Sequence, residues 1–110
     1  MDAAPPPLRG QVFSVDVPGI GRKLWVVVSN NQRNRLLDDL LVVRLTTSRK
    51  TPRPSIVELT DADAPFTGRV LCDDLGPIYR EDLTAPPVGA LSPATMRRID
   101  DGLRAALALR

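Results

Sequence analysis

The chain has 110 residues, of which 43% are hydrophobic and only 4% aromatic, and it carries 15 Lys and Arg against 13 Asp and Glu. This length accommodates one domain with a small core of Val, Leu and Ala, and the hydrophobic content excludes an intrinsically disordered chain. The lack of histidine excludes an imidazole base, and the single Cys72 excludes an internal disulfide, so we expect a protein of the reducing cytoplasm.

The cations gather in the first half of the chain. Residues 1–54 carry nine Lys and Arg against four Asp and Glu, a balance of +5, whereas residues 55–110 carry six against nine, a balance of −3. This excess of cations favours a polyanionic partner, although a solvated surface with uneven charge explains the same distribution. No apolar run approaches the roughly 20 residues of a membrane span, and we expect no membrane contact.

The N-terminal residues 1–8 include three consecutive prolines and lack the basic and apolar regions of a secretory signal. They predict a disordered or extended lead-in. A single domain over residues 9–110 follows.

Three segments in the first half of this domain have the composition of β-strands: residues 9–17, 23–29 and 40–46. The first alternates apolar and polar side chains, as a half-buried strand does. The second is mostly apolar, so we expect it in the centre of the sheet. In the third, Val42, Arg44 and Thr46 share one face. A turn at residues 18–21 joins the first two strands.

The polar residues 30–39 predict a short helix capped by Ser29, Asn30 or Asn31. We expect Leu36 and Leu37 to pack this helix onto the sheet.

The second half of the chain begins with a basic loop at residues 47–54. A fourth strand over residues 55–60 and a fifth over residues 69–72 follow. Gly76-Pro77 predicts a break in any extension of the fifth strand, and residues 83–91 predict short extended pieces.

The clearest helix covers residues 92–109. Ser92 suits the N-cap and Pro93 the first helical position. An apolar stripe runs along one side: Met96, Ile99, Leu103 and Leu107. Asp100 and Arg104 have the spacing of a helical ion pair, and Gly102 is a mild weakness.

These elements predict a mainly β (α+β) fold: a small twisted antiparallel sheet or half-open SH3-like barrel, with the C-terminal helix and a short helix after the second strand. The open sheet edges favour a homodimer.

Antiparallel pairing of the second and third strands brings the start of one beside the end of the other. Arg22 and Lys23 then lie next to Thr46, Thr47 and Ser48, so two cations meet a row of hydroxyls at one rim of the sheet. Such a cluster suits a phosphate group.

Five segments, in this order and spacing, resemble the MazF/PemK/Kid toxins: RGQVF at 9–13, VVSNN at 27–31, VRLTTS at 43–48, VLCDDLGPI at 70–78 and VGALS at 88–92. The resemblance covers about residues 9–109. It implies the fold described above and a toxin that cleaves single-stranded RNA at short sequences without a metal.

The resemblance also implies where the chemistry lies. The family uses an arginine at the start of its second strand and a threonine or serine at the end of its third, and these positions fall on Lys23 and Thr46. The chain departs from the family at Leu24 (usually proline), Asp74 (usually glutamine) and Gly76 (usually arginine). Lysine is not equivalent to a bidentate guanidinium, and an acid repels a phosphate.

The reaction implied is attack by the 2′-hydroxyl of RNA on the adjacent phosphate, which leaves a 2′,3′-cyclic (or 3′) phosphate and a 5′-hydroxyl. Our hypothesis gives Lys23 the proton transfer, Arg22 the phosphate and Thr46 a hydrogen bond to a non-bridging oxygen. The remaining candidates for RNA binding are Thr47, Ser48, Arg49, Lys50, Arg53, Asn31 and Asp74.

No cofactor is expected. A metal pair at Asp73 and Asp74 is disfavoured, because adjacent residues of a strand point to opposite faces. Trp25 suits a core or dimer contact better than base stacking. Cys72 suits a small core position.

The expected partners are single-stranded RNA, whether messenger, transfer or ribosomal, and a small acidic antitoxin that the basic half would bind. Two alternatives stay open. One is a toxin on the same scaffold that resembles CcdB and binds DNA gyrase, and the other is a relative that binds nucleic acid or a partner without cleavage. Lys23 and Thr46 also have structural explanations, as a strand-end lysine and a packed strand residue.

Overall fold

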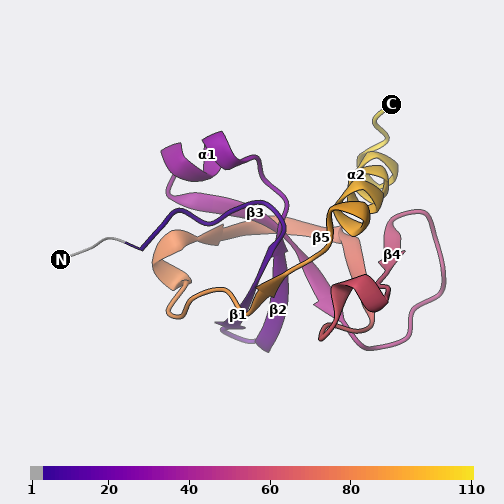
Figure 1. The fold of residues 1–110 in the computed structure, drawn as a ribbon, viewed down its shortest axis with the longest axis horizontal. Coiled ribbons are helices and arrows are strands. Elements are labelled where there is room, and N and C mark those ends of the chain that lie inside the picture. Colours follow the sequence, from indigo (N-terminus) through magenta and orange to yellow (C-terminus); the bar gives the residue numbers. More distant parts are fainter. Residues whose placement is uncertain (1–3) are drawn as a thin grey trace.

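The computed structural model describes residues 4–110 (Figure 1). One antiparallel sheet has the strand order β4-β5-β3-β2-β1-β6. The strands are β1 Gln11–Val17, β2 Gly21–Val27, β3 Asp39–Thr46, β4 Ile56–Glu58, β5 Arg69–Tyr79 and β6 Gly89–Ala90. The helices are α1 Asn31–Leu36 and α2 Pro93–Leu107, with 3₁₀ turns η1 Asp61–Asp63 and η2 Arg80–Asp82. The predicted mainly β fold with a C-terminal helix is confirmed, and β2 is an interior strand as expected.

Both faces of the sheet carry a buried apolar cluster. Because successive residues of a strand point to opposite faces, each of the longer strands contributes to both clusters. The first face, which we call the helix face, packs against α2 and contains Val12, Val26, Val43, Leu45, Val57, Val70 and Cys72. The opposite face, which we call the second face, carries a smaller buried cluster of Phe13, Val15, Val27, Leu40, Val42 and Ile78, with Trp25 partly buried against it.

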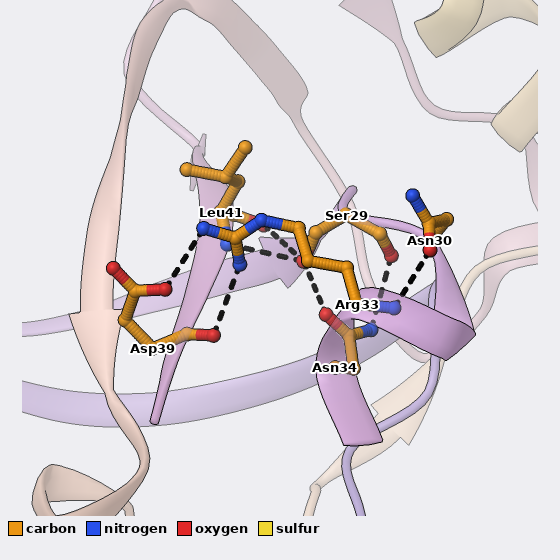
Figure 2. A network of polar contacts seen from close by, with 6 residues as sticks. All are labelled: Ser29, Asn30, Arg33, Asn34, Asp39 and Leu41. Atoms are coloured by element: carbon orange, nitrogen blue, oxygen red, sulfur yellow. Dashed lines mark hydrogen bonds and ion pairs between the residues drawn. The ribbon is translucent and has the colours of Figure 1, made fainter. Parts of the chain in front are cut away.

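Helix α1 begins as predicted, with the Asn30 side chain accepting a hydrogen bond from the Arg33 amide at 2.8 Å. The expected packing of Leu36 and Leu37 is wrong, because these side chains are 71% and 46% exposed. Polar contacts hold the helix instead. Figure 2 shows the buried Asn34 donating to the Ser29 carbonyl at 3.0 Å, and Figure 2 also shows Arg33 paired with the Asp39 carboxylate at 2.8 Å.

Strand β5 does not stop at Cys72 as predicted but continues through Pro77 to Tyr79. Its pairing with β3 contains an irregularity between Val42 and Arg44 of β3, which absorbs extra β5 residues. Pro77 is tolerated because β4 pairs only with residues 69–71, so the rest of that edge of β5 needs no amide donors.

Helix α2 confirms the predicted N-cap, because Ser92 Oγ accepts from the Thr95 amide at 3.1 Å and Pro93 occupies the first turn. The stripe is buried at Met96 and Ile99, but Leu107 is 51% exposed near the C-terminus.

Two sequence predictions about α2 are wrong. Asp100 pairs with Arg9, which precedes β1, and Arg104 pairs instead with Asp101 at 2.8 Å. Gly102 is not merely a weak point, since a Cβ there would lie 2.7 Å from Cys72 Sγ. The close approach of α2 to β5 therefore requires this glycine.

No helix within residues 4–110 is long and apolar enough to cross a membrane. Residues 4–8 contain no helix or strand, and Pro7 is buried. The earlier part of the expected lead-in, residues 1–3, lies outside the described residues.

Candidate active site

The pairing of β2 with β3 brings together the two residues that the sequence singled out. Leu24 lies opposite Leu45, and Trp25 lies opposite Arg44. One further step of the same register places Lys23 opposite Thr46, both on the second face. Opposed side chains on one face of an antiparallel pair have Cβ atoms about 4.5–5.5 Å apart, so this register makes Lys23 and Thr46 candidates for one shared site.

The Thr46 hydroxyl is available as a donor. Its Oγ1 accepts a hydrogen bond from the Ser48 amide at 3.1 Å, and the side chain is only 7% exposed. Because a hydroxyl has one proton and two lone pairs, this contact orients the oxygen and leaves the proton for another acceptor.

Arg22 lies on the opposite side of the pleat from Lys23. It pairs with Asp16 in the register of β1, and its Nη1 donates to the Ser14 carbonyl at 3.3 Å and to Ser14 Oγ at 3.2 Å. Arg22 nevertheless borders a groove of about 720 Å³ on the second face. The guanidinium is thus near the site without sharing the face of Lys23 and Thr46.

Asp74 and Asn31 are two further candidates. Asp74 borders the same groove as Arg22. Asn31 begins α1, beyond the other end of β2, where its Oδ1 accepts from the Arg9 amide at 2.7 Å. The structure does not bring Asn31 to the end of β2 where Lys23 lies.

The basic loop that follows Thr46 is attached at its far end. Arg53 pairs with Asp73 at 2.9 Å, and Ser55 Oγ donates to the same carboxylate at 2.6 Å. The hydrogen bonds from Ser55 and Arg53 lower the pKa of the Asp73 carboxyl. The exposed remainder of the predicted set follows Thr46 directly: Thr47, Ser48, Arg49 and Lys50.

A scan for protein families matches residues 8–107 to the family described as "PemK-like, MazF-like toxin of type II toxin-antitoxin system". The chain belongs to this family. The resemblance read from the sequence is thereby confirmed over nearly the whole chain.

Named relatives of this MazF-family chain are endoribonucleases. Endoribonuclease MazF4 of Mycobacterium tuberculosis (strain ATCC 25618 / H37Rv) is 44% identical over 103 residues, which cover 94% of each protein. Endoribonuclease MazF1 of Mycobacterium bovis has the same identity and coverage. The family and these relatives support the assignment of the chain as a toxin endoribonuclease.

Solved structures of MazF proteins and of a mycobacterial endoribonuclease have the same fold as this chain. A mycobacterial endoribonuclease in complex with its cognate antitoxin superimposes with a TM-score of 0.86 at 43% identity, covering 94% of this chain and 97% of the other. A MazE–MazF structure from Deinococcus radiodurans has a TM-score of 0.81 at 19% identity, covering 97% and 100%, which shows the shared fold.

Arg69 contacts the candidate site of this MazF-family chain and was not among the residues predicted from the sequence. It lies opposite Thr46 in the β3–β5 register, and its Nη1 donates to the Thr47 and Ser48 carbonyls at 3.0 and 2.6 Å. Its Nε also pairs with Glu58 at 3.0 Å. One feature of the sequence could have identified Arg69: it is the first residue of a strand, β5, that pairs with the end of β3.

The buried Cys72 is not a nucleophile here. Burial, together with the nearby charge of Asp73, raises the pKa of the Cys72 thiol to about 11. A thiol that is fully buried and protonated at neutral pH packs as a small apolar group, as the sequence predicted. Within residues 4–110, no three cysteine or carboxylate side chains gather as a metal site requires.

Proposed function

We propose that this chain cleaves single-stranded RNA at short sequences without a metal ion, using Lys23 and Thr46. The observation that supports the proposal is the β2–β3 register, because Lys23 and Thr46, one step beyond Leu24 and Leu45, share a face. The Thr46 oxygen accepts from the Ser48 amide, which leaves the hydroxyl proton for a substrate. The 44% identity to named endoribonucleases supports the same reaction class.

The reaction is a transesterification within the RNA strand. The 2′-hydroxyl loses its proton to solvent and attacks the adjacent phosphorus, the bond from phosphorus to the 5′ oxygen breaks, and Lys23 supplies a proton to that oxygen. Thr46 donates to a non-bridging oxygen, where negative charge grows in the transition state. The products are a 2′,3′-cyclic (or 3′) phosphate and a 5′-hydroxyl.

The surrounding residues act on the flanking RNA in this proposal. Arg22 contacts phosphate from the border of the groove, and the exposed Arg49 and Lys50 bind the backbone beyond the cleaved linkage. Arg53 contributes less than the sequence implied, since Asp73 already neutralises its charge.

The proposal includes a homodimer and an acidic antitoxin, and it places the protein in the cytoplasm. A similar mycobacterial endoribonuclease has been solved with its cognate antitoxin, which supports an antitoxin for this chain also. The +5 balance of residues 1–54 gives an acidic peptide and RNA the same kind of surface to bind.

The test is incubation of the purified protein with a long single-stranded RNA in EDTA, followed by primer extension. We expect discrete cuts, and no cut where the 2′-hydroxyl at a cleaved position is replaced by hydrogen. Intact RNA, continued cleavage at the 2′-deoxy position, or gyrase-dependent DNA breaks in place of RNA cleavage would each overturn the proposal.

A further inference from the structure

Two neighbouring donors on the second face have no acceptor. The indole Nε1 of Trp25 and the guanidinium Nε of Arg44 are both buried, and neither has a hydrogen-bond partner within the described residues. Trp25 and Arg44 lie directly opposite each other on β2 and β3. Buried polar groups are nearly always paired, so two adjacent orphans of the same polarity need an explanation.

The charge of Arg44 is also uncompensated. Among residues 4–110 the guanidinium of Arg44 forms no ion pair, whereas five other arginines do: Arg9, Arg33, Arg53, Arg69 and Arg104. Holding a half-buried cation without a carboxylate costs free energy, and such a cost is typical of a binding site.

The position of Arg44 connects it to the proposed active site. Arg44 precedes Thr46 by two residues on β3, so both lie on the second face. Lys23 is the diagonal neighbour of Arg44 across the pair of strands, where side chains lie about 7–8 Å apart at their base and long ones still meet.

Together these residues carry only donors: the Lys23 ammonium, the Thr46 hydroxyl, the Arg44 Nε and the Trp25 Nε1. The last two are closed to solvent, so a ligand reaches them when the side chains shift. A group that satisfies all four has several acceptor oxygens and a negative charge. A phosphodiester has both, and its two non-bridging oxygens match a guanidinium.

We propose that Arg44 and Trp25 contact the scissile phosphodiester, with Arg44 as the guanidinium that neutralises its charge and Trp25 as a neutral donor beside it. This inference rests on the proposed function and adds two residues to it. Trp25 then acts through its Nε1 hydrogen as well as through its packing against the buried cluster of the second face.

The experiment measures single-turnover cleavage of RNA in EDTA and binding of a 2′-O-methyl RNA that cannot be cleaved. We expect Arg44→Met to slow cleavage about a hundredfold. We also expect it to reduce the slope of log binding constant against log salt concentration by about 1, the amount for one lost phosphate contact. We expect Trp25→Phe to slow cleavage about tenfold, since it keeps the ring and loses the donor. The matched control is Arg35→Met on the exposed side of α1, which should cleave at the wild-type rate.

Thermal unfolding separates function from structure. Because Arg44 Nε loses no hydrogen bond on substitution, Arg44→Met should melt at or above the wild-type temperature. Three outcomes would overturn the inference while leaving the proposed function intact. These are wild-type cleavage by Arg44→Met, a rate loss matched by unfolding, and a rate loss caused by dissociation of a dimer in sedimentation. If the wild type itself cuts no RNA, the proposed function fails and this inference fails with it.

Discussion

Gly68 approaches the end of β3 so closely that a Cβ on it would lie 2.2 Å from the carbonyl oxygen of Thr46. Gly68 also has a φ of +102°, a backbone angle that residues other than glycine rarely adopt. This glycine therefore lets the turn before β5 pack against the residue that supplies the proposed catalytic hydroxyl.

Gly68→Ala should destabilise the fold by about 3 kcal/mol or more, because backbone strain adds to a clash with backbone atoms. Gly19→Ala is the matched control, since Gly19 has a φ of +82° but nothing within 4 Å of its Cβ position. The Gly19→Ala variant should lose only about 1 kcal/mol of unfolding free energy. Urea unfolding measures the stability of both variants. Equal losses would show that the close contact of Gly68 with Thr46 does not add to the cost of the substitution.

The sequence predicted the placement of Lys23 beside Thr46 because that placement depends on local features. Two β-branched runs that follow each other closely in the chain pair antiparallel, and the register follows from the apolar pattern, which keeps Val26, Val43 and Leu45 on the helix face. The N-cap at Ser92 was equally accessible, since capping depends on residues within one turn.

The errors concern contacts that side chains make outside their own helix or strand. Leu36 and Leu37 looked like packing residues, yet α1 is held by Asn34 and by Arg33, whose partners lie outside the helix. Arg69 meets the carbonyls after Thr46 only once β5 has paired with β3. No local pattern in the sequence encodes such a contact, so the residue was missed.

Removal of the Thr46 hydroxyl should slow cleavage about a hundredfold, because one donor to the transition state is lost. Thr46→Val keeps the shape of the side chain, and Thr46→Ser keeps the hydroxyl and should retain most of the activity.

Lys23→Ala should also slow cleavage about a hundredfold, through loss of the proton donor. Single-turnover rates on one RNA check all three variants, with circular dichroism to confirm folding. Wild-type rates in Thr46→Val and Lys23→Ala would move the site elsewhere.

Arg69 is expected to act as a positioning residue, because it holds the Thr47 and Ser48 carbonyls and touches no substrate in the proposed reaction. Arg69→Met should lower kcat about tenfold while the affinity for uncleavable 2′-O-methyl RNA stays within about threefold. Glu58→Gln is the control, since it weakens the ion pair of Arg69 and keeps the carbonyl contacts. A parallel loss of affinity in Arg69→Met would indicate direct RNA contact instead.

The carboxylate of Asp63 joins η1 to the start of α2. It is 1% exposed and accepts hydrogen bonds from the Ser92 amide at 2.8 Å, the Thr95 hydroxyl at 2.6 Å and the Thr60 amide at 3.1 Å. Burial alone would raise the pKa of Asp63, but these hydrogen bonds outweigh it and leave the pKa below the ordinary 3.8. The negative charge also lies at the positive end of the α2 dipole.

A carboxyl whose pKa is lowered by folding stabilises the protein above its unfolded pKa and loses that effect as the pH falls through its folded pKa. Asp63→Asn should therefore cost about 2–3 kcal/mol at pH 7, and its deficit relative to wild type should shrink as the pH drops below about 4. Urea unfolding across that range measures the deficit, with the exposed Asp61→Asn as control for the general effect of one carboxylate. A deficit that stayed constant from neutral to acid pH would show that the Asp63 charge contributes nothing, and that shape alone explains the loss.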